Sequence, residues 1–190
     1  MYPAGTVPRD FLHHYARQFQ TIELNSTFYG IPTASVVDGW RRKVPDTFVF
    51  CPKVFRDASH DDSPVVALKA MRAFAEVISR LGPRLGGCFL QLPPELGPLQ
   101  RVRLVDLLDV WPTELPIAVE FRHPDWFSGG QLIDSAVATL QAAGAGVVIT
   151  DVAGRRDVCH STLTTELVMI RCVGNNLHPT DRLRATWWAQ

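Results

Sequence analysis

Short apolar segments alternate with longer amphipathic segments along this 190-residue chain, and this alternation restricts the folds open to it. Most of the short segments are near-continuous apolar runs, which is typical of parallel strands covered on both faces. The segments between them have the length and periodicity of helices. Such repetition predicts an α/β fold with parallel strands and right-handed crossovers, in a single domain over residues 1–190. The expected strands are residues 21–25, 48–53, 87–92, 116–121, 146–151 and 167–172, and the expected helices are residues 8–19, 34–43, 65–81, 99–111, 131–143 and 181–188.

The composition is that of an ordinary globular protein, with 46% hydrophobic residues and 19 Lys and Arg against 19 Asp and Glu. The net charge of zero gives no overall field to attract nucleic acid, although a local basic patch stays possible. No apolar run reaches the ~18 residues of a membrane-spanning helix, so no membrane partner is expected. The N-terminal sequence lacks signal-peptide features, and the four cysteines are far apart. Both features favour reduced, mostly buried thiols and a cytoplasmic location.

A polar side chain stands at or near the carboxyl end of every expected strand. In α/β barrels and in open α/β sheets, ligands bind at these carboxyl ends. Because side chains alternate along a strand, Glu23 and Asn25 share one face of the first strand, and Glu120 and Arg122 share one face of the fourth. At each single position, the alternative is that the residue is polar only because the chain reaches the solvent there. The set comprises Glu23, Asn25, Lys53, Gln91, Glu120, Arg122, Asp151 and Arg171.

The basic members of this set suggest an anionic ligand, such as a phosphate, a sugar acid or another carboxylate, bound by Lys53, Arg122 and Arg171. Glu23 and Glu120 are candidate catalytic groups, because two carboxylates in unlike surroundings can divide the roles of acid and base. The same carboxylates can instead be ion-paired with the cations. Lys53 has a further interpretation as a Schiff-base lysine in a dry pocket.

The remaining candidates would orient the substrate or complete the acid–base chemistry. His60 follows the second strand and is a candidate catalytic acid or base, although Ser59-His60-Asp61 can equally be a polar approach to the next helix. Tyr29 and Trp126 follow strand ends and are candidate walls of a substrate pocket, with core packing as the alternative. The groups expected to bind substrate hydroxyls are Asn25, Gln91 and Asp151.

Metal and cofactor sites have little support in the sequence. Glu23, His60, Glu120 and Asp151 can be combined into a ligand set, but no HExxH or HxH spacing connects them, so no metal is expected. The GxGxxG and GxxxxGK[ST] patterns that cradle nucleotide phosphates are absent from the sequence, so no cofactor is expected.

Two runs of the chain are quite specific, Glu23-Leu-Asn25-Ser-Thr-Phe-Tyr29 and Gln91-Leu-Pro-Pro94. Together with Val119-Glu-Phe-Arg-His123, they resemble the YecE-like family, catalogued as domain of unknown function 72. The resemblance covers almost the whole chain and implies a TIM-type (β/α)8 barrel without an established activity. The expected strands match the family's second to seventh, so its first and last strands would lie outside residues 1–190. The aromatic residue and the histidine that the family tends to carry near Arg171 are absent here.

An incomplete TIM-type barrel with about six βα units is therefore expected. The exposed edge strands of an incomplete barrel can pair with another chain, so a homodimer that covers these edges is possible. Fold alone cannot choose among three functions. The first is an enzyme, a lyase, isomerase or hydrolase, that acts on a small anionic hydroxylated substrate at the barrel mouth. The second is a non-catalytic binding protein for an anionic metabolite or nucleic acid, and the third is an inactive partial family member.

Overall fold

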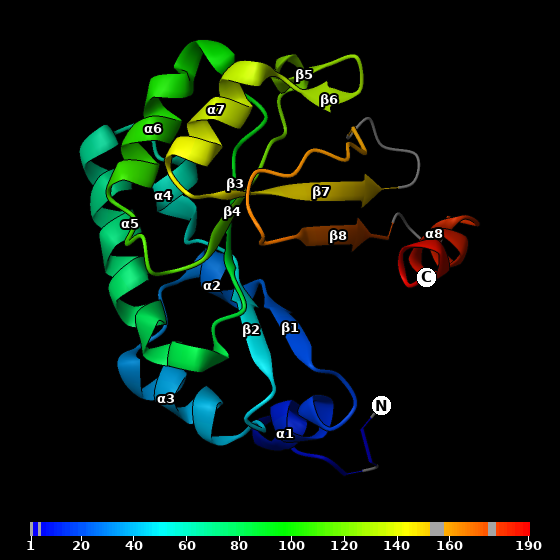
Figure 1. The fold of residues 1–190 in the computed structure, drawn as a ribbon. Coiled ribbons are helices and arrows are strands. Elements are labelled where there is room, and N and C mark those ends of the chain that lie inside the picture. The colour runs from blue at the N-terminus through cyan, green and yellow to red at the C-terminus, as the bar shows by residue number, and fades with distance from the viewer. Residues whose placement is uncertain (1, 4, 153–157, 175–177) are drawn as a thin grey trace. The chain divides into compact units, whose positions relative to one another are not determined.

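The computed structural model describes residues 2–3, 5–152, 158–174 and 178–190. The chain divides into two compact units, Met1–Phe89 with Val110–Pro116, and Leu90–Asp109 with Ile117–Gln190. All six strands expected from the sequence are present, each within two residues of its expected bounds (Figure 1). The prediction of an α/β fold with parallel strands is therefore confirmed. Strand β3 (Cys88–Gln91) runs from the first unit into the second.

In the first unit, strands β1 (Thr21–Leu24) and β2 (Val49–Pro52) pair in parallel. Parallel bridges also join the β2 segment to the segment of β3, from Phe50 to Leu85 and from Lys53 to Phe89. Phe50 is fully buried and packs against the rings of Phe48 and Trp40, so aromatic burial holds this small sheet to its helices. The helices of this unit are α1 (Phe11–Ala16), α2 (Ser26–Tyr29), α3 (Ala34–Arg42), α4 (Arg56–His60) and α5 (Pro64–Ile78), with 3-10 turns η1 (Pro8–Asp10) and η2 (Ser79–Arg84).

The helix expected over residues 65–81 is shorter than predicted at its end. Helix α5 begins at Pro64, whose fixed φ suits a first helical turn, and it passes into the 3-10 turn η2 after Ile78. Within η2, Gly82 has a φ of 53°, which is a left-handed conformation that glycine adopts without steric cost. Gly82 therefore interrupts the helical segment, but the α-helix itself ends earlier than expected, at Ile78.

In the second unit, β4 (Ile117–Glu120), β7 (Gly146–Val152) and β8 (Met169–Val173) follow β3 in the order β3-β4-β7-β8. Helices α6 (Arg101–Asp109) and α7 (Asp134–Ala142) lie on one side of this sheet (Figure 1). The pairing of β7 with β8 places Thr150 opposite Arg171 and Asp151 opposite Cys172. Because side chains alternate along a strand, Arg171 and Asp151 point to opposite faces of the sheet. The unit also contains the 3-10 turns η3 (Pro98–Gln100) and η4 (Pro124–Trp126) and the helix α8 (Asp181–Trp188).

A hairpin that the sequence did not predict precedes α7. Strands β5 (Phe127–Ser128) and β6 (Gln131–Leu132) pair antiparallel, so the helix expected over residues 131–143 begins only at Asp134. The connection is Gly129-Gly130, with φ values of 58° and 78°. Two successive residues with positive φ form the turn that two-residue hairpins prefer, which explains why the chain reverses here.

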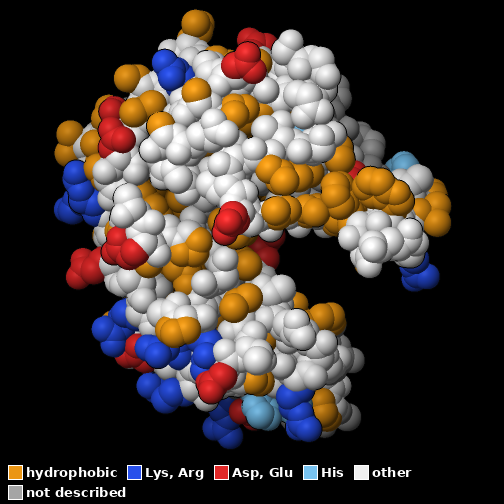
Figure 2. Space-filling view, in the orientation of Figure 1, with side chains coloured by type: hydrophobic (Ala, Val, Ile, Leu, Met, Phe, Trp, Pro, Cys, Tyr) orange, Lys and Arg blue, Asp and Glu red, His pale blue; other side chains and the backbone are white. Residues whose placement is uncertain are grey.

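The cysteines and the apolar surface differ in part from the sequence expectation. All four cysteines are free, as expected, but Cys159 and Cys172 are exposed, so the thiols are not mostly buried. In the part of the chain that the structure describes, no helix combines the length and the hydrophobicity needed to cross a bilayer. Figure 2 shows hydrophobic side chains over the β8 and α8 part of the second unit, and Leu183 and Trp187 of α8 are among the exposed ones.

Candidate functional site

Polar side chains lie at or follow the carboxyl ends of β1 and β2, and two of them contact one aromatic ring. We call this group, which consists of Glu23, Asn25, Phe28, Lys53 and His60, the Phe28 cluster. The ammonium nitrogen of Lys53 lies 3.9 Å from the centroid of the Phe28 ring, which is a cation–π contact. The His60 ring packs against the same ring in an edge-to-face arrangement, with ring centroids 5.3 Å apart. Asn25 donates a 2.7 Å hydrogen bond from Nδ2 to Oε1 of Glu23. Lys53 and His60 therefore contact the same ring, and Asn25 contacts Glu23.

Thr27 holds the two strand ends that carry the Phe28 cluster. Its side chain is buried, and its hydroxyl oxygen lies 2.7 Å from the carbonyl oxygen of Leu24 and 2.6 Å from that of Lys53. The backbone amide of Lys53 also donates to the Leu24 carbonyl, at 3.1 Å. The next residue is Phe28, so the short helix α2 fixes the ring beside Lys53. This explains why a Thr-Phe pair follows the strand directly.

The other candidates of this unit lie at the border of the Phe28 cluster. The Nδ1 atom of His60 is 2.6 Å from the hydroxyl oxygen of the buried Ser59, which orients the imidazole at the end of α4. Tyr29 is 79% exposed and contacts the edge of Phe28, with ring centroids 5.3 Å apart. The central residue, Phe28, was missed as a site residue from the sequence. An apolar ring directly after a strand end and before an exposed Tyr is the signal that would have found it.

The second unit contains a buried carboxylate between two guanidinium groups, and we call Glu120, Arg122 and Arg171 the Glu120 cluster. Glu120 has no exposed surface, and it forms ion pairs with Arg122 and Arg171, whose side chains are 14% and 10% exposed. The ion-paired alternative considered from the sequence therefore describes Glu120. Removing a carboxylate from water costs several kcal/mol unless charged partners compensate it. Two guanidinium groups and one carboxylate therefore lie together in a largely dry environment.

Trp126 packs in the core of the second unit, which was the alternative to its role as a pocket wall. Its side chain is fully buried, its indole nitrogen donates a 2.7 Å hydrogen bond to the carbonyl of Leu96, and its ring lies 4.8 Å from that of Phe121. It therefore offers no exposed wall to a ligand. Gln91 is half-buried at the end of β3, and the next amide, of Leu92, donates to the carbonyl of Glu120 at 2.9 Å.

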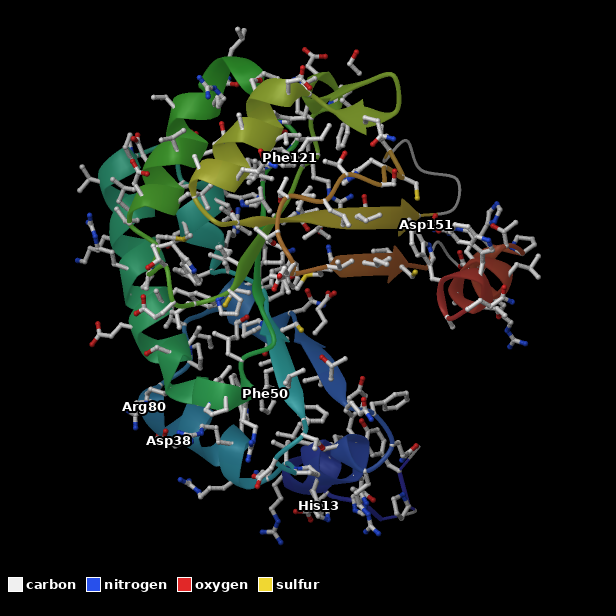
Figure 3. The ribbon with its side chains drawn as sticks, viewed as in Figure 1. His13, Asp38, Phe50, Arg80, Phe121 and Asp151 are labelled. Atoms are coloured by element: carbon white, nitrogen blue, oxygen red, sulfur yellow. The ribbon has the colours of Figure 1, made fainter. Side chains whose placement is uncertain are left out.

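Asp151 lies apart from Arg171, on the opposite face of the sheet, where it points toward α8 (Figure 3). Its carboxylate accepts a 2.7 Å hydrogen bond from Nε of Arg184 and a 2.8 Å hydrogen bond from the indole of Trp188. Arg184 also forms an ion pair with Asp151 and a longer one with Asp181. Asp151 thus anchors α8, and the structure does not bring it to the Glu120 cluster.

The residues considered as metal ligands are divided between the units, with Glu23 and His60 in the first and Glu120 and Asp151 in the second. Among the residues that the structure describes, no three His, Cys, Asp or Glu side chains converge as metal ligands would.

Known proteins are similar to this chain in both sequence and fold. The family described as "Protein of unknown function DUF72" matches residues 1–190. UPF0759 protein YecE of Escherichia coli (strain K12) is 36% identical over 140 residues, which are 74% of this chain and 52% of YecE. UPF0759 protein YunF of Bacillus subtilis (strain 168) is 26% identical over 135 residues, which are 67% of this chain and 48% of YunF. The chain thus spans about half the length of the curated relatives it matches.

Two solved structures have a similar fold. The crystal structure of a DUF72 family protein from Thermotoga maritima MSB8 has a TM-score of 0.73 at 26% identity, and it covers 93% of this chain and 69% of that one. A DUF72 family protein from Enterococcus faecalis V583 has a TM-score of 0.70 at 22% identity, with 81% of this chain and 59% of that chain covered. The sequence motifs, the parallel α/β fold and a family match over all 190 residues lead to one conclusion: this chain belongs to the DUF72 family.

Proposed function

We propose that this chain binds a small anionic, hydroxylated molecule at the carboxyl ends of its strands, with the Glu120 cluster as the anion-binding group. The observation that supports this most is the position of two largely buried guanidinium groups, Arg122 and Arg171, on the buried Glu120. A charge that is largely shielded from water attracts an anion more strongly than a solvated surface charge does. The planar guanidinium group also suits carboxylates, because it donates two parallel hydrogen bonds.

We further propose that the protein is an enzyme, a lyase, isomerase or hydrolase. The acid–base groups proposed for it are Glu23 and His60, and this proposal concerns the first unit by itself. Glu23 is held by Asn25 near the end of β1, and His60 is held by Ser59 at the end of α4, so a carboxylate and an imidazole are both oriented. Oriented groups of these types transfer protons in catalysis. Lys53 and Tyr29 are assigned to substrate binding in the first unit, and Gln91 in the second unit. A non-catalytic binding protein would use the same Glu120 cluster without turnover.

A titration with sugar acids tests the anion site. We expect D-glucuronate or D-gluconate to raise the unfolding temperature, since a ligand at about 100 times its Kd adds roughly 2.7 kcal/mol to stability. The variant Arg122→Gln should lose this effect, whereas Arg182→Gln, which removes an exposed arginine of α8, should keep it. Equal responses of both variants, or no response of the native chain to either acid, would rule out the proposed site.

A second measurement separates the enzyme from the binding protein. Mass spectrometry of the bound sugar acid after incubation would show a product if the chain is catalytic. The variant Glu23→Gln should then abolish product formation. Binding without product would favour the non-catalytic alternative.

The finer points of fold and assembly also remain proposals. Six parallel strands and the similarity to solved DUF72 structures support an incomplete TIM-type barrel, formed as one domain. Among the described strands, β8 ends the order β3-β4-β7-β8, and its exposed Ile170 and the adjacent Val168 support a homodimer that covers this edge. The chain matches about half the length of YecE, so any activity of the whole protein is proposed and not shown. A cytoplasmic location likewise stays a prediction.

A further inference from the structure

A second charged site lies in the first unit, away from the Phe28 cluster. A pocket of about 370 Å³ is lined by Asp38, Arg41, Arg42 and Arg84, from the last turns of α3 and the end of η2. Arg84 pairs with Asp46, which precedes the amino end of β2, whereas Lys53 of the Phe28 cluster follows its carboxyl end. Lys and Arg side chains gather over this part of the surface in Figure 2. We call it the arginine pocket.

Two of the arginines around the pocket are neutralised by carboxylates. Arg80 donates to both oxygens of Asp38, at 3.1 and 2.5 Å, and the two side chains lie next to each other in Figure 3. The hydrogen bond from Arg80 lowers the pKa of Asp38, so this carboxylate keeps its charge. Arg84 forms an ion pair with Asp46 and donates a 2.7 Å hydrogen bond to the Asp46 carbonyl.

The other two arginines form no ion pair in the described part of the chain, although their charges help to lower the pKa of Asp38. Arg41 donates a 2.9 Å hydrogen bond to a neutral acceptor, the backbone carbonyl of Arg80. The Arg42 guanidinium has no hydrogen-bond or ion-pair partner in the described part of the chain, and Nε of Arg84 is buried there without an acceptor. Four guanidinium groups against two carboxylates therefore leave a surplus of two positive charges at one small pocket, with donor groups still available.

We propose that the arginine pocket binds the phosphate group of a small phosphorylated molecule. A phosphate monoester carries about −1.5 to −2 charges at pH 7, which matches the surplus of two. Its three free oxygens accept several hydrogen bonds from guanidinium groups, which donate in a fixed fork. The volume exceeds what a phosphate group alone needs and falls in the range of small-molecule sites, roughly 300–1,000 Å³. The remainder of the ligand would occupy that space.

Arg41 and Arg42 also affect the stability of the fold, and the test has to distinguish this effect from an effect on ligand binding. Both residues lie in the last turn of α3, where cations stabilise the helix dipole. A charge-removing variant can therefore lower stability without any ligand. Both side chains are exposed, so glutamine in their place leaves the core unchanged. Arg72, an exposed arginine of α5 in the same unit, provides a matched control for the loss of one charge.

Isothermal titration calorimetry of the folded chain with inorganic phosphate and with glucose 6-phosphate, at constant ionic strength, tests this proposal. We expect the native chain to bind both, and Arg42→Gln to bind at least roughly tenfold more weakly, the smallest loss typical of a charge-assisted hydrogen bond. Arg72→Gln should bind as the native chain does. In NMR spectra, the Nε–H signal of Arg84 should shift as phosphate is added.

Four outcomes would overturn the proposal. The first is no binding of either phosphate. The second is equal weakening in Arg42→Gln and Arg72→Gln, which would indicate diffuse attraction. The third is binding that is kept in Arg42→Gln but lost in Arg122→Gln, which would assign the phosphate to the Glu120 cluster. The fourth is binding of a single-stranded oligonucleotide without binding of the small phosphates, which would indicate a nucleic-acid surface.

Discussion

Arg171 of β8 reaches Glu120 of β4 although β7 lies between these two strands in the sheet. Its side chain extends on the face where Thr150 of β7, its neighbour in the pairing, is also buried. The ion pair therefore connects strands that share no backbone hydrogen bond. A buried carboxylate that is held from two sides fixes the relative position of β4 and β8 and keeps both guanidinium groups oriented.

Replacing Arg171 by methionine should destabilise the second unit. The variant leaves Glu120 buried with Arg122 as its remaining ion-pair partner, and removing one member of a buried ion pair costs about 3 kcal/mol or more. Urea unfolding followed by circular dichroism measures this loss of free energy. The control Arg182→Met removes an exposed arginine, for which a change within about 0.5 kcal/mol is expected. Equal effects of the two variants would contradict the role of the buried pair.

The variant Asp151→Ala should release α8 from the sheet. None of the side chains of α8 is buried, so its attachment depends on the contacts of Arg184 and Trp188 with Asp151. Losing charge-assisted hydrogen bonds should speed amide hydrogen exchange in residues 181–188 by roughly tenfold or more. Asp106→Ala removes an exposed carboxylate of α6 and should leave this exchange unchanged. Unchanged exchange in Asp151→Ala would show that other contacts hold α8.

The strands were predictable because a short continuous apolar run is typical of a parallel strand that is covered on both faces. The hairpin β5–β6 was not, because each strand has two residues, too few for any periodicity to appear. The helix expected from Gln131 was misplaced for the same reason, since Gly129-Gly130 indicates a turn only when the pairing on both sides is known. The short helices α2 and α4 likewise lack a full amphipathic repeat.

The candidate site was predictable as a set of residues but not as an arrangement. Polar residues at strand ends pointed to Glu120 and Arg171, and their ion pair was among the alternatives. The orientation of Asp151 depends on its alignment with β8, because a shift of one residue moves a side chain to the other face. The part played by Phe28 depends on the turn that brings its ring to Lys53, which no spacing in the sequence specifies.

Thr27→Val should weaken the end of the β1–β2 pair. Valine has a similar shape but lacks the hydroxyl that contacts the carbonyls of Leu24 and Lys53, so a buried polar group loses a partner at a cost of about 1–2 kcal/mol. Thermal and urea unfolding measure the change, and the exposed Thr47→Val serves as the control. If both variants unfold alike, the Thr27 hydroxyl does not hold the strand ends.

The stability of the second unit should fall as the pH is lowered below about 6.5 because of His160. This side chain is buried, and burial lowers its pKa from the usual 6.5, an effect that outweighs a hydrogen bond with the backbone of Val148. Its Nδ1 atom accepts from the amide of Thr162 at 3.2 Å, so protonation there would break a contact of the folded state. Below pH 6.5 the unfolded chain therefore binds more protons than the folded chain, and acid favours unfolding. Unfolding free energies measured from pH 7.5 to 5 should decrease over this range, with a smaller slope in His160→Gln. An NMR titration of the His160 ring that gave a pKa above 6.5 would contradict this prediction.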